Sequence, residues 1–267
     1  MHKKASRIGG FFVGAKNTRM NLECPNLPPA TRLLEVIVSS VEDALEAERG
    51  GAGRLEIVRN LELGGLTPSF ETVQEIYQRI ALPLRVMLRC SESHIPARHE
   101  VEILSQQAEV LAALGVDGVA LGFLGQQQVD VDLVRQVLSH APKLKATFHR
   151  AFDETSHPLA AIQQLKELRQ VDRILTSGGD GPWETRAKRL ENYQQVAAPE
   201  ITILVGGGVD RVAIERLLSQ TSQLREFHSG RAVRIPAEAS GAVRAERVKE
   251  LVGSLSGSPA PGHPGRP

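Results

Sequence analysis

The chain has 267 residues, of which 41% are hydrophobic and 24% charged, and its formal net charge at pH 7 is +1. This composition is ordinary for a globular protein with a full core, and the near-zero charge gives no general attraction for nucleic acid or an anionic membrane. Only two cysteines, Cys24 and Cys90, are present, which argues against a disulfide framework and favours a reducing compartment, the cytoplasm. No apolar run reaches the roughly 20 residues of a membrane helix. We therefore expect neither a nucleic-acid partner nor a membrane partner.

The two ends of the chain differ in composition from its centre. Residues 1–31 are basic with scattered Gly and Pro, and residues 254–267 are rich in Pro, Gly and Ser. Neither composition supports a packed core, so both segments are predicted to be disordered, with organelle targeting as the alternative for the first. Residues 32–253 contain no linker and are predicted to form one domain.

Short apolar strands alternate with amphipathic helical patterns through this central region. The predicted strands span residues 33–38, 55–58, 84–89, 118–122, 145–149, 172–176, 201–205 and 225–228. The helices that follow them span 41–50, 70–80, 99–114, 131–138, 157–168, 184–196, 212–219 and 239–252. About eight such units predict the α/β fold class and a (β/α)₈ TIM barrel, with a doubly wound open sheet as the alternative.

Charged side chains recur at alternating positions of these strands, where they would share one face. In a barrel that face points inward, and buried charges need partners of opposite sign. For charged residues at the carboxyl-terminal ends of strands, a functional role is favoured over a structural one, because barrels hold their active sites at those ends. Arg89, His149 and His228 fall at such ends, and Glu56 and Glu226 are expected to orient these basic groups or share proton transfer, so these five are the candidate catalytic residues. The alternative is a buried ion-pair network, including Arg54, that only fixes the register of the barrel.

The stretch KLKATFHRAFD at residues 143–153 ends a strand in groups that carry charge or a proton. We expect His149 to act as a general acid or base, and Arg89 and Arg150 to hold an anion. Glycine-rich turns after two later strands offer backbone amides to an anion, although a tight connection explains them equally well. The candidate ligand-binding residues are Glu35, Arg150, Asp153, Ser177, Gly178, Gly179, Gly206, Gly207 and Gly208.

Other polar residues receive structural or solvent-exposed roles. Asp117 and Asp172 begin their strands, so they belong to the opposite rim of the barrel. Cys90 should face the helices, and His94 lies in a polar loop, where histidines are usually solvated. A zinc site from His149, His228 and Glu56 is conceivable, but no tight spacing supports it, so the metal ligands stay unassigned.

Seven motifs, in this order, resemble the CutC family of copper homeostasis proteins. They are LEV at 34–36, RLEI at 54–57, GGLTPS at 64–69, TFHRAFD at 147–153, LTSGG at 175–179, GGGV at 206–209 and EFHSG at 226–230. The resemblance implies a cytosolic (β/α)₈ barrel that self-associates as a dimer or tetramer. It also implies one Cu(I) per subunit, the cofactor proposed for the family.

Two positions depart from the family pattern. Family members commonly carry cysteines, the candidate Cu(I) ligands, where this chain has Ile37 and Val58. Cu(I) prefers thiolate and thioether donors, and neither aliphatic side chain can donate. Three hypotheses for the function therefore remain. The first is copper homeostasis with Cu(I) binding, and the second is an enzyme that acts on a small anionic metabolite such as a sugar or its phosphate. A non-catalytic scaffold is the third, and whether the protein is an enzyme stays open.

Overall fold

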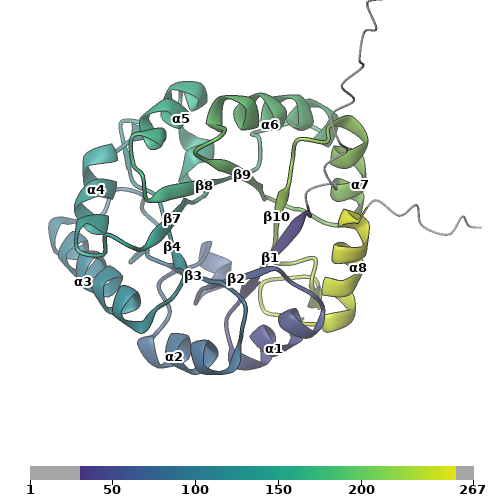
Figure 1. The fold of residues 1–267 in the computed structure, drawn as a ribbon, viewed down its shortest axis with the longest axis horizontal. Helices are drawn as coiled ribbons and strands as arrows, with labels where there is room; N and C mark the ends of the chain where they lie inside the picture. Colours follow the sequence, from purple (N-terminus) through teal and green to yellow (C-terminus); the bar gives the residue numbers. More distant parts are fainter. Residues whose placement is uncertain (1–30, 257–267) are drawn as a thin grey trace, which may run out of the picture. The chain divides into compact units, whose positions relative to one another are not determined.

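The computed structural model describes residues 31–256, and their strands form a closed parallel barrel (Figure 1). Around the barrel the strand order is β1-β10-β9-β8-β7-β4-β3-β2, and β1 pairs with β10 to close it. This closure confirms the predicted TIM barrel and excludes the open sheet. The barrel strands are β1 (Leu33–Val38), β2 (Arg54–Ile57), β3 (Leu84–Met87), β4 (Gly118–Leu121), β7 (Lys145–Phe148), β8 (Val171–Thr176), β9 (Thr202–Val205) and β10 (Glu226–Ser229).

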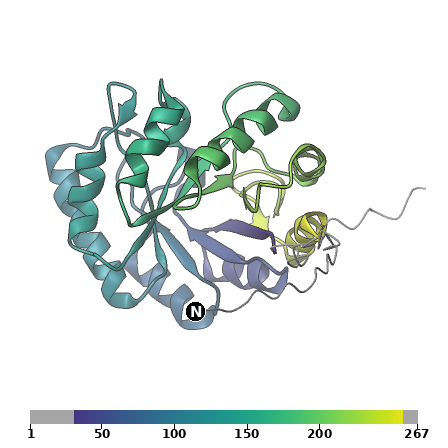
Figure 2. The ribbon, with the colours of Figure 1, turned by 45° about the horizontal axis from the view of Figure 1, so that its top comes forward.

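The helices form an outer ring around the strands (Figures 1 and 2). They are α1 (Val41–Arg49), α2 (Phe70–Arg79), α3 (Arg98–Leu114), α4 (Val131–Ser139), α5 (Pro158–Lys166), α6 (Trp183–Ala197), α7 (Arg211–Gln220) and α8 (Ala245–Leu255). Ser69 and Asp210 cap the amino ends of α2 and α7 by accepting hydrogen bonds from backbone N–H groups of the first turn. The core lies between this ring and the outward strand faces, which are apolar, as at Val36, Ile57 and Val86.

Short elements that periodicity did not predict decorate the barrel. The hairpin β11 (Arg234–Ile235) and β12 (Ala242–Val243) stands where the last helix was expected to begin, so that helix starts six residues later than predicted. Buried Arg234 fixes this hairpin to α1, because its Nη1 lies 3.0 Å from Asp43 Oδ2. A second hairpin pairs β5 (Leu124–Gly125) with β6 (Gln128–Val129), and the 3₁₀ helices η1 (Leu61–Leu63) and η2 (Arg150–Glu154) follow β2 and β7. Two-residue strands are too short to show alternation.

The predicted disordered ends lie almost entirely outside the described residues. Thr31, at the end of the N-terminal segment, and the start of the C-terminal segment are described, and the latter is helical because α8 continues to Leu255. Within residues 31–256, no helix combines the length and apolarity needed to cross a bilayer.

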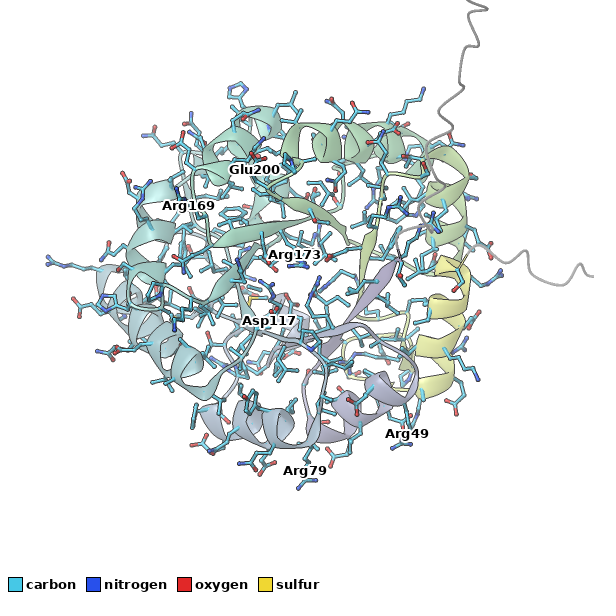
Figure 3. All side chains as sticks on the ribbon, viewed as in Figure 1. Arg49, Arg79, Asp117, Arg169, Arg173 and Glu200 are labelled. Carbon is cyan, nitrogen blue, oxygen red and sulfur yellow. The ribbon has the colours of Figure 1, made fainter. Side chains whose placement is uncertain are left out.

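Side chains on the inner strand faces divide the barrel interior along its axis. Ionisable groups such as Arg173 and Asp117 project at the centre of the ring, whereas Arg49 and Arg79 point away from it (Figure 3). Nearer the carboxyl ends of the strands lies an apolar collar, a buried cluster distinct from the main core. Its members are Ile37, Val58, Met87 and Ala120.

Candidate functional site

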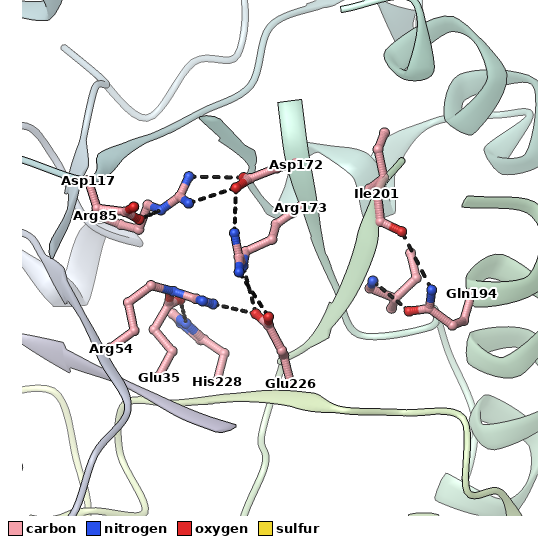
Figure 4. Close-up of polar contacts among 11 residues, drawn as sticks. Glu35, Arg54, Arg85, Asp117, Asp172, Arg173, Gln194, Ile201, Glu226 and His228 are labelled. Atoms are coloured by element: carbon pink, nitrogen blue, oxygen red, sulfur yellow. Dashed lines mark hydrogen bonds and ion pairs between the residues drawn. The ribbon is translucent and has the colours of Figure 1, made fainter. Parts of the chain in front are cut away.

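Nine ionisable side chains form a series of acid–base contacts through the amino-terminal half of the barrel, which we call the charge chain. Figure 4 labels all of its members except Glu56. In order they are Asp117, Arg85, Asp172, Arg173, Glu226, Arg54, Glu35, His228 and Glu56. Strand register brings some of them together, since Glu35 lies beside Arg54 on one neighbouring strand and beside His228 on the other.

Each arginine of the charge chain binds two acids. Arg85 is bidentate to Asp172 at 3.0 and 2.9 Å, and its Nε lies 2.8 Å from Asp117 Oδ2. Arg173 contacts Asp172 and donates to Glu226 at 2.7 and 3.0 Å. Arg85 and Arg173 were not predicted as partners of these acids, although each shares strand parity with inward residues. That parity was the available signal.

Arg54 joins this lower part to the cavity floor. It donates to Glu35 and, at 2.6 Å, to Glu226. Burial would raise the pKa of the Glu35 carboxyl, but the charge of Arg54 and the hydrogen bond from His228 lower it far below its usual range. The pKa of Glu226 is lowered as well, since Arg173 and Arg54 outweigh its burial. Neither acid lines the cavity above, so the structure places both in the ion-pair network.

The last two members of the charge chain, His228 and Glu56, reach the cavity. His228 Nδ1 lies 2.7 Å from Glu35 Oε1, and its Nε2 lies 3.8 Å from Glu56 Oε2. Burial raises the pKa of Glu56 to about 7, with Glu35 adding and the imidazolium charge of His228 opposing. Burial opposes a charged His228, yet Glu56 and Glu35 raise its pKa above the ordinary value. Glu56 Oε1 is buried without a hydrogen-bond partner within residues 31–256.

Above the charge chain, a cavity of about 1340 Å³ opens at the carboxyl ends of the strands. The apolar collar supplies Ile37, Val58 and Met87 to its wall, and the loops after the strands supply most of the rest. A barrel of this kind holds its reacting groups at this end, so the cavity is the candidate active site. It is large enough for a small metabolite.

His149 lies in the cavity wall just after β7 and is 4% exposed. Its Nδ1 accepts a hydrogen bond of 3.2 Å from the Ala151 N–H, so the neutral ring carries its proton on Nε2. Burial, with the nearby His94 and Arg89, holds its pKa well below the ordinary value. His149 is therefore a neutral hydrogen-bond donor, and its Nε2 has no partner in the described part of the chain.

His94 is not solvated, contrary to the sequence-based expectation. The loop after β3 folds over the cavity and places the His94 ring 5.1 Å from that of His149, between centroids. Its Nε2 lies 3.1 Å from Glu154 Oε1, which makes Nε2 the donor and leaves Nδ1 as an acceptor with no partner found in residues 31–256. Burial and Arg89 lower its pKa, while Glu154 opposes them. Loop conformation, which no periodicity predicts, brings it here.

Two arginines line the cavity near these rings. Arg89 is half-buried and donates to the Glu92 carbonyl, and its Nε has no partner among the described groups. Arg150 is exposed and donates from Nε to Asp153 Oδ2 at 3.0 Å. His149, Arg89 and Arg150 thus line one cavity, and their roles toward an anionic ligand stay predictions.

The glycine turns differ from one another. The Ser177 N–H donates to both Asp153 oxygens at 3.1 Å, and Thr176 Oγ1 donates to Asp153 Oδ1 at 2.5 Å. The amides of Gly178 and Gly179 are bound by the hydroxyls of Thr176 and Ser177, so this turn already holds a carboxylate and does not line the cavity. In the later turn, the Gly206 N–H donates to the Thr176 carbonyl at 2.9 Å, whereas Gly207 and Gly208 line the cavity.

The donor set in the cavity does not suit a thiolate-bound Cu(I). Ile37 and Val58, which replace the family cysteines, lie in the cavity wall, and Cys90 packs against the main core instead. Within the part of the chain that is described, Met87 brings the only sulfur atom of the cavity wall. The other donors are imidazoles and carboxylates, which favour harder divalent ions.

Comparison with known proteins agrees with the motifs. The model of the CutC family matches residues 32–233. The mouse copper homeostasis protein cutC homolog is 35% identical over 198 residues, which cover 73% of this chain and 72% of the relative. A family protein CutC of Xanthomonas campestris pv. campestris strain 8004 is 37% identical over 204 residues, which cover 73% of this chain and 82% of that protein.

Solved structures give the same result for the fold. A CutC protein from Streptococcus agalactiae superposes with a TM-score of 0.69 at 26% identity, covering 75% of this chain and 98% of that one. A thiamine phosphate pyrophosphorylase from Pyrococcus furiosus has a TM-score of 0.52 at 17% identity, covering 84% and 95%. That second likeness concerns the fold alone.

Proposed function

This chain belongs to the CutC family of copper homeostasis proteins, and on that premise we propose that its barrel is an enzyme acting on a small anionic metabolite. The observation that carries the proposal is a pair of cavity imidazoles that both carry their proton on Nε2 but leave different nitrogens without a partner in the described residues. His149 presents an N–H, and His94 presents a lone pair. Together they offer a hydrogen-bond donor and a proton acceptor to one molecule.

Proton shift beside a carbonyl group is the reaction class that such a pair supports. His94 Nδ1 removes a proton from the carbon next to the carbonyl, while the His149 Nε2–H stabilises the negative charge that develops on the carbonyl oxygen. The proton then returns from His94 to the product, so the reaction is balanced without a further reactant. A neutral imidazole suits the donor role, because its N–H can donate without being lost.

Arginine positions support an anionic group on the substrate. Arg89 and Arg150 follow β3 and β7 and line the same cavity as the imidazoles. The charges of both arginines lower the pKa of His149 and so help to keep the ring neutral. A phosphate or carboxylate bound there would lie beside the reacting carbonyl.

Cu(I) binding in the cavity is the second proposal, and it follows from the names of the relatives. The donors that support it are the Met87 thioether and the cavity imidazoles. Self-association and a cytoplasmic location stay predictions.

A deuterium-exchange experiment tests the enzyme proposal. The protein is incubated in D₂O with a panel of phosphorylated and carboxylated hydroxy-carbonyl compounds, and proton wash-out beside the carbonyl is followed by NMR. We expect wash-out from at least one compound, with loss of exchange in His94→Ala and His149→Gln and no loss in the exposed control Arg169→Gln. Exchange from none of the panel, or equal exchange by all variants, would refute the proposal. Cu(I) retained near stoichiometry against a chelator would favour the second.

A further inference from the structure

We propose that the cavity floor is a binding site for one divalent transition-metal ion of the Zn²⁺ type, ligated by His228 Nε2 and Glu56. Glu35 would hold the imidazole in place from the other side. The site is separate from His149 and His94, so it does not depend on the reaction proposed above.

At the cavity floor, His228 is oriented as a metal-binding histidine would be. The hydrogen bond of 2.7 Å between His228 Nδ1 and Glu35 Oε1 fixes the ring and directs Nε2 toward Glu56. A carboxylate behind the imidazole in this way is the usual second-shell partner of a metal-bound histidine. Ligand atoms of Glu35, Glu56 and His228 all lie within 4.8 Å of one another.

Distance also permits an ion between the two ligands. His228 Nε2 and Glu56 Oε2 are 3.8 Å apart, too far for a hydrogen bond. Zn²⁺ binds imidazole nitrogen and carboxylate oxygen at about 2.0–2.2 Å each, so two such bonds span this gap with an angle at the metal. Positions left open would face the cavity and its water or ligand.

An unpartnered oxygen is the independent observation for a ligand here. Glu56 is 2% exposed, and its Oε1 has no hydrogen-bond partner within residues 31–256. Leaving a buried carboxylate oxygen unpaired costs about 1–3 kcal/mol or more. The Arg54 guanidinium donates to Glu35 and Glu226 and makes no hydrogen bond to Glu56 Oε1.

The test measures metal binding by the full chain without any substrate. Chelator-treated protein is equilibrated with Zn²⁺ or Co²⁺, and bound metal is counted after gel filtration and titrated for affinity. We expect one ion per chain, and at least a 100-fold weaker affinity in Glu56→Gln and His228→Gln. Glu92→Gln, which removes an exposed acid of the same cavity, should bind as the wild type does.

Two readouts keep the proposal falsifiable if a variant folds poorly. Glu56→Gln preserves side-chain shape, and its circular dichroism and melting temperature in the absence of metal show whether it is folded. Visible absorption of the Co²⁺ form should lack the intense thiolate band that a cysteine ligand would give. No bound metal in the wild type, unchanged affinity in folded Glu56→Gln, or a thiolate band would each overturn the site.

Discussion

The two halves of the barrel interior both contain buried ionisable groups, yet they differ in how those groups are paired. In the charge chain, Arg85, Arg173 and Arg54 each contact two carboxylates. In the cavity wall, His149 and His94 each leave one ring nitrogen without a partner in residues 31–256. A saturated network holds the barrel together, whereas an unsatisfied buried donor or acceptor is available to a ligand. Glu56 and His228 lie where the two halves meet.

Removing an arginine from the charge chain should have the largest effect on the free energy of unfolding. Arg54→Met removes the guanidinium that pairs with Glu35 and Glu226, so that Glu35 keeps only His228 and Glu226 keeps only Arg173 as a partner in the interior. Urea unfolding should show a loss of about 3–5 kcal/mol in the free energy of unfolding. Arg169→Met on the exposed surface is the control and should stay within about 0.5 kcal/mol. A loss below about 1 kcal/mol for Arg54→Met would mean that the charge chain is not what fixes this half.

Substituting the cavity histidines, which leave ring nitrogens without partners in the described residues, should affect turnover more than stability. His149→Gln removes the unpartnered Nε2–H of a residue that lines the cavity, and losing a donor of this kind typically lowers kcat about 10²–10³-fold. Deuterium-exchange rates measure this effect, and urea unfolding of the same variant measures stability. If stability falls by several kcal/mol while the exchange rate per folded molecule is unchanged, His149 is structural.

Opposite pH dependences should separate the two regions in metal-free protein. The pKa of Glu56 is raised to about 7 in the fold, so the folded state binds more protons and loses stability as pH rises from about 4.5 to 7. The pKa of His149 is lowered, so the unfolded state binds more protons and stability falls as pH drops below about 6.5. Urea unfolding from pH 5 to 8 should show Glu56→Gln removing the first slope, on the order of 2 kcal/mol. His149→Gln should remove the second, and a wild-type slope that neither variant changes would contradict both assignments.

The smallest expected effect concerns the carboxylate behind His94. Glu154 is exposed, so Glu154→Gln should change the free energy of unfolding by less than about 0.5 kcal/mol. It should lower the exchange rate about tenfold and shift the acidic limb of the pH profile, because the carboxylate raises the pKa of His94. If Glu154 positions His94, the pH profile should shift in this way. An unshifted profile would show that Glu154 does not act through His94.

The sequence predicts more of the charge chain than of the cavity. Strand alternation identified Glu35, Arg54, Glu56 and His228 as one inward set, because parity follows from the backbone. Asp117 and Asp172 were correctly expected on the opposite rim, where Arg85 binds them. The arginines that complete the network were missed, since parity marks a face and not a partner.

Features of the cavity depend on loops, where local pattern carries less information. His94 approaches His149 only because the loop after β3 folds over the strand ends. The glycine turn after β8 has the composition of an anion site, but the residue that fills it, Asp153, is 24 positions away from Ser177. Contacts of this kind follow from the folded geometry and not from periodicity.

The bound carboxylate in that turn has a consequence for how a substrate could enter. Because the Asp153 carboxylate accepts the hydrogen bond of the Ser177 amide, a side chain of the protein already occupies the turn that binds phosphate in many such barrels. An anionic group of a substrate would therefore meet the side chains of Arg89 and Arg150, which line the cavity, and not the amides of the turn after β8.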